Sequence, residues 1–199
     1  MGTFQKTIEA LQERVGAGPK DRLDWVVQTV QRSLKTPADW QNLRLELAIF
    51  IAAQPDGWVD YTQEILAPPE DQTREILRKF GEAIARAVHR EPVPMGRFGA
   101  DVALWWLPRT QCYYEQTAKD TAWLPRAMLA LRPLIREYGH LVKECPARVS
   151  RGEPDDICGT WFVATRPRQE YCSARCQSRA STRAKREGIA TAAMLKRQG

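Results

Sequence analysis

Long hydrophobic runs are absent from this sequence. No stretch of its 199 residues approaches the roughly eighteen consecutive apolar residues that a membrane-spanning helix needs. The first residues, MGTFQKTIEALQERV, also lack an apolar segment of the length found in secretory signal peptides. Both absences predict a soluble, cytoplasmic protein.

Motifs for catalysis are also missing. The chain contains two histidines, no glycine-rich phosphate loop and no H-E-x-x-H pattern of the kind that binds catalytic zinc. No serine, histidine and acidic residues can be assigned to a hydrolytic triad from the sequence. We therefore expect no catalytic residues and no enzymatic activity.

Cysteine is scarce and unevenly distributed. Of the five cysteines, one stands apart at Cys112 and is predicted to be a small buried hydrophobic residue, with a reactive thiol as the alternative. In a reducing cytoplasm, clustered cysteines bind metals more often than they form disulfides. The other four cysteines are therefore the candidate metal ligands: Cys145, Cys158, Cys172 and Cys176.

The spacing of these four cysteines is C-x12-C followed, after thirteen residues, by C-x3-C. Four thiolates in two pairs predict a closed, structural Zn2+ site, although the first pair is wider than the usual two to four residues. His140 is an alternative to Cys145 as the fourth ligand. About forty residues with few apolar side chains cannot form a core, so zinc is expected to hold this module together.

The residues around the cysteines resemble the CGNR zinc-finger family. The resemblance rests on Cys158-Gly159-x-Trp161-Phe162 and on Tyr171-Cys172-Ser173-x-x-Cys176-x-x-Arg179-Ala180, followed by a basic helix. It implies a helical N-terminal region, called the ABATE domain, and a bacterial transcription regulator with a DNA-binding zinc module. The motif that names the family reads Cys176-Gln177-Ser178-Arg179 here, and a longer loop separates the first cysteine pair.

The first cysteine pair is predicted to form a knuckle at Cys158-Gly159, in which glycine lets backbone amides approach the sulfur. Trp161 and Phe162 are expected to pack inside the module or against the helical domain, with base stacking as the alternative. The strand that contains them should continue into a hairpin whose tip, residues 165–168, presents Arg166 and Arg168 to solvent.

Basic residues are concentrated in the C-terminal part. Residues 1–142 carry 18 basic and 18 acidic side chains, whereas residues 143–199 carry 12 and 6, so the whole net charge of +6 lies in the second segment. A neutral domain joined to a basic segment is typical of a protein that binds a polyanion.

The second cysteine pair is predicted to lie at the start of a helix that Ser173 caps and Gly188 ends. Arginines recur on one face of this helix without acids at i, i+4 up to residue 186, which favours contact with a polyanion over a merely solvated basic face. The candidate nucleic-acid-binding residues are Arg175, Arg179, Arg183, Lys185 and Arg186 in the helix, with Arg166 and Arg168.

The first 142 residues are predicted to form a mainly α-helical domain. Between residues 91 and 116 proline and glycine interrupt the helical pattern, and the alternation of Val102, Leu104 and Trp106 with their neighbours predicts one or two short strands. Thr36-Pro37 is the signature of a helix start. The tryptophans are expected in the core, and a small-molecule effector could bind this domain. Apolar periodicity predicts helices over residues 4–15, 23–34, 37–51 and 124–142, the last bent at Pro133, and a further long helix that follows Pro68-Pro69 and extends to Val88.

Together these patterns predict a helical domain over residues 1–142 and a zinc module of knuckle-plus-helix type over residues 143–199. The expected function is zinc-dependent DNA binding in transcription regulation. RNA binding is one alternative, because arginine stripes serve both nucleic acids. A zinc-stabilised module that docks protein partners is the other. No membrane partner is expected.

Overall fold

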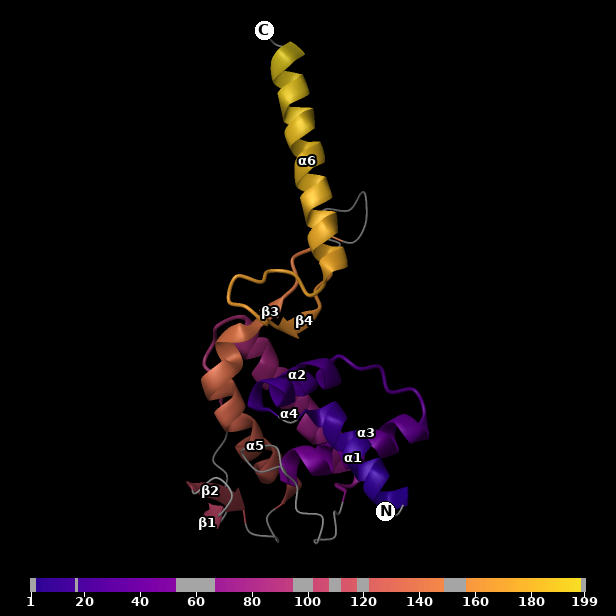
Figure 1. The fold of residues 1–199 in the computed structure, drawn as a ribbon, viewed down its shortest axis with the longest axis vertical. Helices are drawn as coiled ribbons and strands as arrows, with labels where there is room; N and C mark the ends of the chain where they lie inside the picture. Colours follow the sequence, from indigo (N-terminus) through magenta and orange to yellow (C-terminus); the bar gives the residue numbers. More distant parts are fainter. Residues whose placement is uncertain are drawn as a thin grey trace. The chain divides into compact units, whose positions relative to one another are not determined.

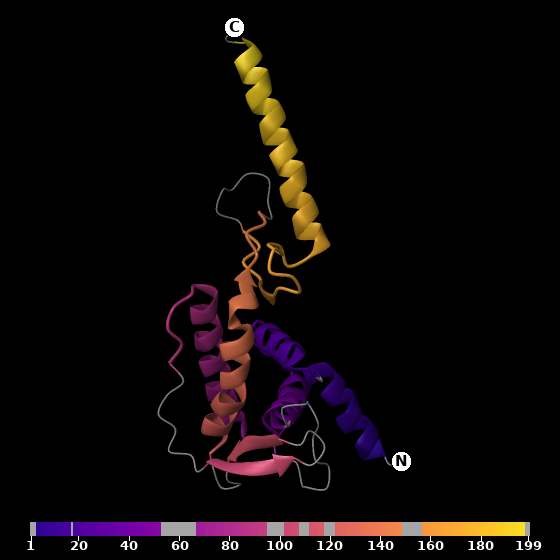
Figure 2. The ribbon, with the colours of Figure 1, turned by 60° about the vertical axis from the view of Figure 1, so that its left-hand side comes forward.

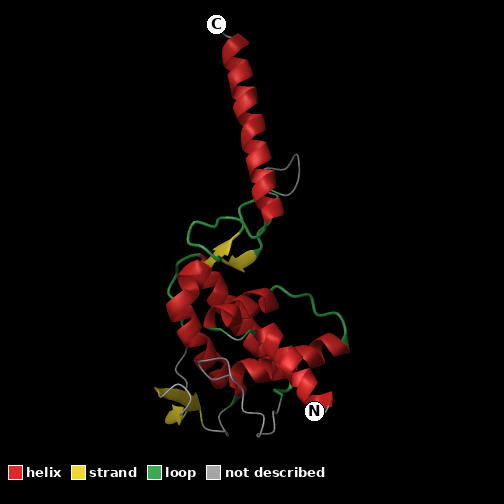
Figure 3. Cartoon of the chain, in the orientation of Figure 1, coloured by secondary structure: helices red, strands yellow, loops and turns green. Residues whose placement is uncertain are grey.

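The computed structural model describes residues 3–16, 18–52, 67–94, 102–107, 112–117, 122–148 and 157–197. The chain divides into two compact units, Met1–His140 and Leu141–Gly199. Most described residues are helical, as the sequence predicts (Figure 3). The segment Pro55-Asp56-Gly57, whose sequence predicts a turn, lies outside the described residues.

The first unit begins with α1 (Thr3–Val15) and α2 (Pro19–Val30). Gly16 separates them with φ of 90°, and a Cβ atom there would lie 2.5 Å from the Cβ of Asp21, so only glycine fits this turn. The prediction that the second helix reaches Leu34 is wrong. The amides of Gln31 and Arg32 bond to carbonyls three residues back, which closes the helix at Val30.

Helix α3 (Pro37–Ala52) starts at the predicted N-cap. The amide of Asp39 donates to Oγ1 of Thr36 at 3.2 Å, and the amide of Thr36 donates to Oδ2 of Asp39 at 2.8 Å, a reciprocal cap that lowers the pKa of Asp39. The ring of Phe50 lies 5.1 Å from that of Trp25 and 5.6 Å from that of Phe80. The helix is therefore central to the unit, as its sequence, apolar on nearly all sides, predicts.

The remaining predicted helices are present, but the prediction that the fifth helix reaches Val142 is wrong, because a 3-10 turn at Gly139–Leu141 ends it and Val142 lies in a strand. Helix α4 (Glu70–Val88) follows the two prolines, and α5 (Trp123–Tyr138) contains Pro133 in its interior. The sequence predicts one or two short strands here, and the structure has two: β1 (Val102–Leu107) and β2 (Cys112–Thr117) pair antiparallel, with Trp105 opposite Tyr114 (Figure 2).

A buried carboxylate that the sequence did not reveal joins three segments of this unit. Glu46 is 1% exposed. Its carboxylate accepts a hydrogen bond from Nε1 of Trp25 at 3.1 Å, and ion pairs connect it to Arg32 at 2.9 Å and to Arg14 at 3.5 Å. Glu46 therefore connects α3 to α1, to α2 and to the segment after α2.

The second unit is a β-hairpin followed by one long helix (Figure 1). After a 3-10 turn at Gly139–Leu141, β3 (Val142–Glu144) pairs antiparallel with β4 (Trp161–Val163). Because β3 pairs with β4, Val142 belongs to the second unit, and the division lies two residues before the predicted boundary.

Helix α6 (Ala174–Arg197) is longer than predicted. It passes through Gly188, so the prediction that this glycine ends the helix is wrong. A glycine inside a helix costs about 1 kcal/mol relative to alanine, but no proline follows, and residues 189–195 include three alanines, a methionine and a leucine. These good helix formers allow α6 to continue for 24 residues, about 36 Å.

Candidate metal centre and basic helix

The hairpin brings the widely spaced first pair of cysteines together. Beyond β3 and β4, the amide of Cys145 donates to the Thr160 carbonyl at 3.0 Å, and the amide of Cys158 donates to the Ala147 carbonyl at 2.7 Å. A bridge between Arg148 and Ile157 continues the pairing. The twelve residues between the two cysteines thus span the two arms of one hairpin and the connection between them.

Gly159 shapes the hairpin next to the cluster. It has φ of 62°, and its amide donates to the Cys145 carbonyl at 3.2 Å while the amide of Cys145 bonds to Thr160. Two residues on one strand therefore oppose one on the other, as in a bulge with a left-handed glycine in first position. As the predicted knuckle requires, the backbone amide of Thr160, directly after Gly159, hydrogen-bonds to the sulfur of Cys158. A second amide, that of Cys172, lies 3.5 Å from Sγ of Cys145.

The second pair is positioned by the start of α6. Cys172 precedes the helix and Cys176 lies in its first turn. Oγ of Ser173 accepts a hydrogen bond from the amide of Cys176 at 3.3 Å, and the Ser173 carbonyl accepts one from Gln177 at 3.1 Å. The predicted cap by Ser173 is therefore confirmed, and it directs both sulfurs to the same side.

The four sulfur atoms form one compact cluster. The Sγ atom of Cys172 lies 3.9 Å from that of Cys158 and 3.7 Å from that of Cys176, and Cys158 and Cys176 are 3.9 Å apart. All four sulfurs lie within 4.8 Å of one another. These distances are nearly twice a disulfide bond of about 2.05 Å, so the thiols are free. The four cysteines are close enough to hold a metal ion.

Two thiols of the cluster have pKa values shifted in opposite directions. The hydroxyl of Thr160, 3.2 Å from Sγ of Cys158, stabilises the thiolate and lowers the pKa of Cys158 to about 7. Burial raises the pKa of Cys172 to about 12. Without a metal, the protein environment therefore favours a thiolate at Cys158 and a thiol at Cys172.

The alternative ligand His140 is not part of this cluster. Among the residues that the structure describes, the group that could hold a metal consists of the four cysteines. His140 is exposed, and its carbonyl accepts a hydrogen bond from Nη2 of Arg90 at 2.9 Å. The side chain of Cys112, in β2, lies outside the described residues.

The predicted basic stripe lies on α6. At about 100° per residue, Arg175, Arg179, Arg183 and Arg186 fall within an arc of about 80°. Arg175, Lys185 and Arg186 are exposed, whereas Arg179 and Arg183 are half-buried. Cys176, next to the stripe, is buried. The cysteine cluster is therefore at the N-terminal end of the helix that contains the arginines.

The second pair of predicted basic residues lies on a turn instead of a hairpin tip. Strand β4 pairs with β3, which precedes it, so the predicted hairpin with its tip at residues 165–168 is wrong. Arg166 and Arg168 are nevertheless exposed, as expected. Phe162 is 8% exposed and Trp161 is half-buried. The packing role predicted for Phe162 is thus confirmed, and its ring is not available for base stacking.

Sequence reasoning missed Thr160 and Lys143. The hydroxyl of Thr160 contacts Cys158, and Nζ of Lys143 donates to the carbonyls of Pro167 at 2.6 Å and Gln169 at 2.8 Å. A threonine two residues after a candidate ligand is a usable sequence signal, because its hydroxyl can reach the sulfur. The role of Lys143 depends on chain segments 24 residues apart and has no local signal.

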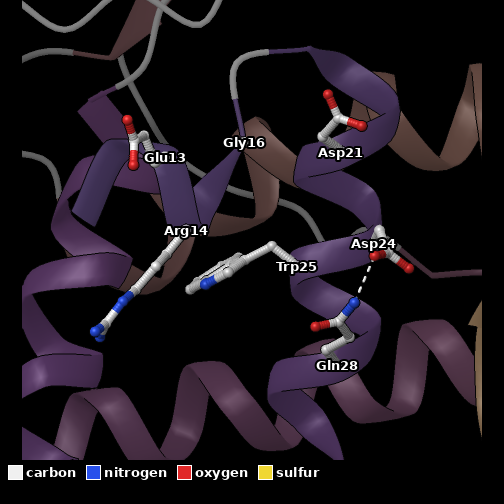
Figure 4. A pocket seen from close by; sticks show the side chains of 7 residues that line it. All are labelled: Glu13, Arg14, Gly16, Asp21, Asp24, Trp25 and Gln28. Atoms are coloured by element: carbon white, nitrogen blue, oxygen red, sulfur yellow. Dashed lines mark hydrogen bonds between the residues drawn. The ribbon is translucent and has the colours of Figure 1, made fainter. Parts of the chain in front are cut away.

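A shallow hollow in the first unit lies between α1 and α2 (Figure 4). Trp25 lies in it, and its Nε1 is already bound to Glu46. The side chains of Asp24 and Gln28 bond to each other at its rim. No buried polar group among the lining residues is left to bind an effector. The lining residues are Glu13, Arg14, Gly16, Asp21, Asp24, Trp25 and Gln28.

None of the helices in the described part of the chain has the length and apolar character that crossing a bilayer requires. The chain matches no family model, no curated protein and no solved structure.

Proposed function

We propose that the four cysteines bind one structural Zn2+. Four sulfurs around an ion at the zinc–sulfur distance of about 2.3 Å would lie about 3.8 Å apart, and three of the sulfur–sulfur distances are 3.7 to 3.9 Å. Four thiolates complete a tetrahedron and leave no position for water. This donor set supports a structural role for the metal over a catalytic one.

The pH dependence of zinc binding tests the thiol environment. A ligand must lose its proton to bind zinc, so affinity should rise with pH. Below about pH 7 the metal must also displace the proton of Cys158, so the slope of log affinity against pH should be larger there by about one. Chelator competition, corrected for protonation of the chelator, measures this slope.

Thr160→Val is the matched variant for that measurement. It removes the hydroxyl that lowers the pKa of Cys158, so the change in slope should move to higher pH. The same change in slope at the same pH in both proteins would show that Thr160 does not act on the thiol.

We further propose that the protein binds DNA, as a transcription regulator of the CGNR type. The observation that supports this proposal is the position of the cysteine cluster at the N-terminal end of α6. The first half of this helix has arginines on one face. Zinc would fix the start of the helix, and the arginines would meet phosphates or base edges. The net charge of +6, all of it in residues 143–199, supports a polyanionic partner.

Salt dependence of duplex binding tests this function. If about four helix arginines contact phosphates, log affinity should fall against log salt with a slope of roughly −3 to −4 from the helix alone. In the full-length zinc-loaded protein, Arg179→Gln with Arg186→Gln should make the slope shallower by about 1.8. Fluorescence anisotropy with a labelled random-sequence duplex gives the affinities.

Arg132→Gln with Arg136→Gln is the matched control. It removes two exposed arginines from α5, in the first unit, and should leave the slope unchanged. Equal slopes for both double variants, or no binding at about 50 mM salt, would refute DNA binding by α6. Tighter binding to an RNA of the same sequence would favour the RNA alternative, and a partner held independently of salt would favour protein docking.

A further inference from the structure

The turn after β4 is held by side chains from both of its ends. Oε1 of Gln169 accepts hydrogen bonds from the amide and the hydroxyl of Thr165, at 2.8 and 2.9 Å, and Nε2 of Gln169 donates to the Tyr171 carbonyl at 3.0 Å. The amide of Gln169 bonds to the Arg166 carbonyl at 2.9 Å. Lys143, on β3, donates to two carbonyls of the same turn.

The three basic side chains of this region differ in what they contact. The ammonium of Lys143 is used on the backbone of the turn. Arg166 and Arg168, on either side of Pro167, are exposed, and neither forms an ion pair with any residue that the structure describes. Proline fixes φ between them. The turn therefore presents two guanidinium groups on an ordered backbone, without an acidic partner.

The turn is also tethered close to the start of α6. Arg175 follows Arg168 by seven positions in the chain, so the Cα atoms of the two arginines can be at most about 25 Å apart. The major groove of DNA is about 12 Å wide. One duplex can therefore contact the turn and the first turns of α6 at the same time.

We propose that the turn Thr165–Gln169 is a preordered binding element for nucleic-acid phosphates, in which Arg166 and Arg168 contact the backbone beside the groove that α6 enters. This inference rests on the proposed nucleic-acid binding. Guanidinium groups match phosphate geometry, and contacts of this kind set the position of a protein on its site without reading sequence. The prior ordering of the turn lowers the entropy cost of binding.

The test measures the affinity of the full-length zinc-loaded protein for a labelled random-sequence duplex. One set of variants changes the charge of the turn and another changes the hydrogen bonds that order it. Arg166→Gln with Arg168→Gln should make the salt slope shallower by about 1.8, so that the wild type loses about tenfold more affinity than the variant between 50 and 200 mM salt. Arg166→Lys with Arg168→Lys keeps both charges and should retain the slope. Gln169→Ala also keeps the charges, and should lower affinity about fivefold by loosening the turn.

Arg132→Gln with Arg136→Gln again controls for the loss of two charges. If the unsubstituted protein binds no duplex, the proposed function fails together with this inference. If it binds, and the glutamine variant keeps the wild-type salt slope, the phosphate role of the turn is overturned while DNA binding by α6 stands. Unchanged affinity of Gln169→Ala would overturn the contribution of the ordered backbone.

Discussion

Replacing Cys176 by serine should release the metal and unfold the second unit while the first unit stays folded. Cys176 supplies one of four sulfurs and lies in the first turn of α6. Zinc contributes about 10 to 16 kcal/mol of apparent binding free energy in zinc-finger peptides. Among the described residues of the second unit, few side chains besides the cysteines are buried and could replace it: Leu141, Val142, Ala147, Phe162, Val163 and Ala164.

Native mass spectrometry should show one zinc per chain in the wild type and none in Cys176→Ser. Hydrogen exchange should become fast at the hairpin amides of the second unit, and the cooperative melting transition of the helical unit should persist. Ser178→Ala, an exposed position on the same helix, is the matched control and should keep both zinc and protection. A metal-free variant with an intact, protected hairpin would contradict the structural role of the metal.

Replacing Glu46 by alanine should strongly destabilise the first unit. Trp25 is only 3% exposed, and the substitution leaves its Nε1 without a hydrogen-bond acceptor. It also removes the ion-pair partner of Arg32. Breaking a buried charged pair costs about 3 to 5 kcal/mol. The side chains of Arg14 and Arg32 are 61% and 37% exposed, so water can solvate them and the lower end of this range is expected.

Glu46→Gln distinguishes the contribution of the Glu46 charge to stability from that of its hydrogen bond with Trp25. The amide oxygen can still accept from Trp25, so this variant should lose about 1 to 2 kcal/mol in urea unfolding, less than alanine. Glu82→Gln is the surface control, because Glu82 pairs with Arg78 and Lys79 on an exposed face of α4, where ion pairs contribute little. Equal unfolding midpoints for Glu46→Ala and Glu82→Gln would show that the buried network does not stabilise the fold.

Structural features that depend only on residues close together in the sequence could be predicted from it. The cap of α3 depends on Thr36 and Asp39 within one turn, and the placement of Cys172 and Cys176 depends on a cap three residues long. The end of α6 could not be predicted from Gly188 alone, because the cost of one glycine is smaller than the combined helical preference of the residues that follow.

The sequence by itself determined the succession of helices, the presence of short strands in the first unit, the set of candidate metal ligands and the concentration of positive charge after residue 142. Each depends on local periodicity, capping or composition. Only the tertiary structure decided that Cys145 joins Cys158 across a hairpin, that Glu46 is buried among Trp25 and two arginines, and that Lys143 holds the Arg166–Arg168 turn. These contacts join segments far apart in the chain, and their free energy depends on strand register and on packing, which local patterns do not encode.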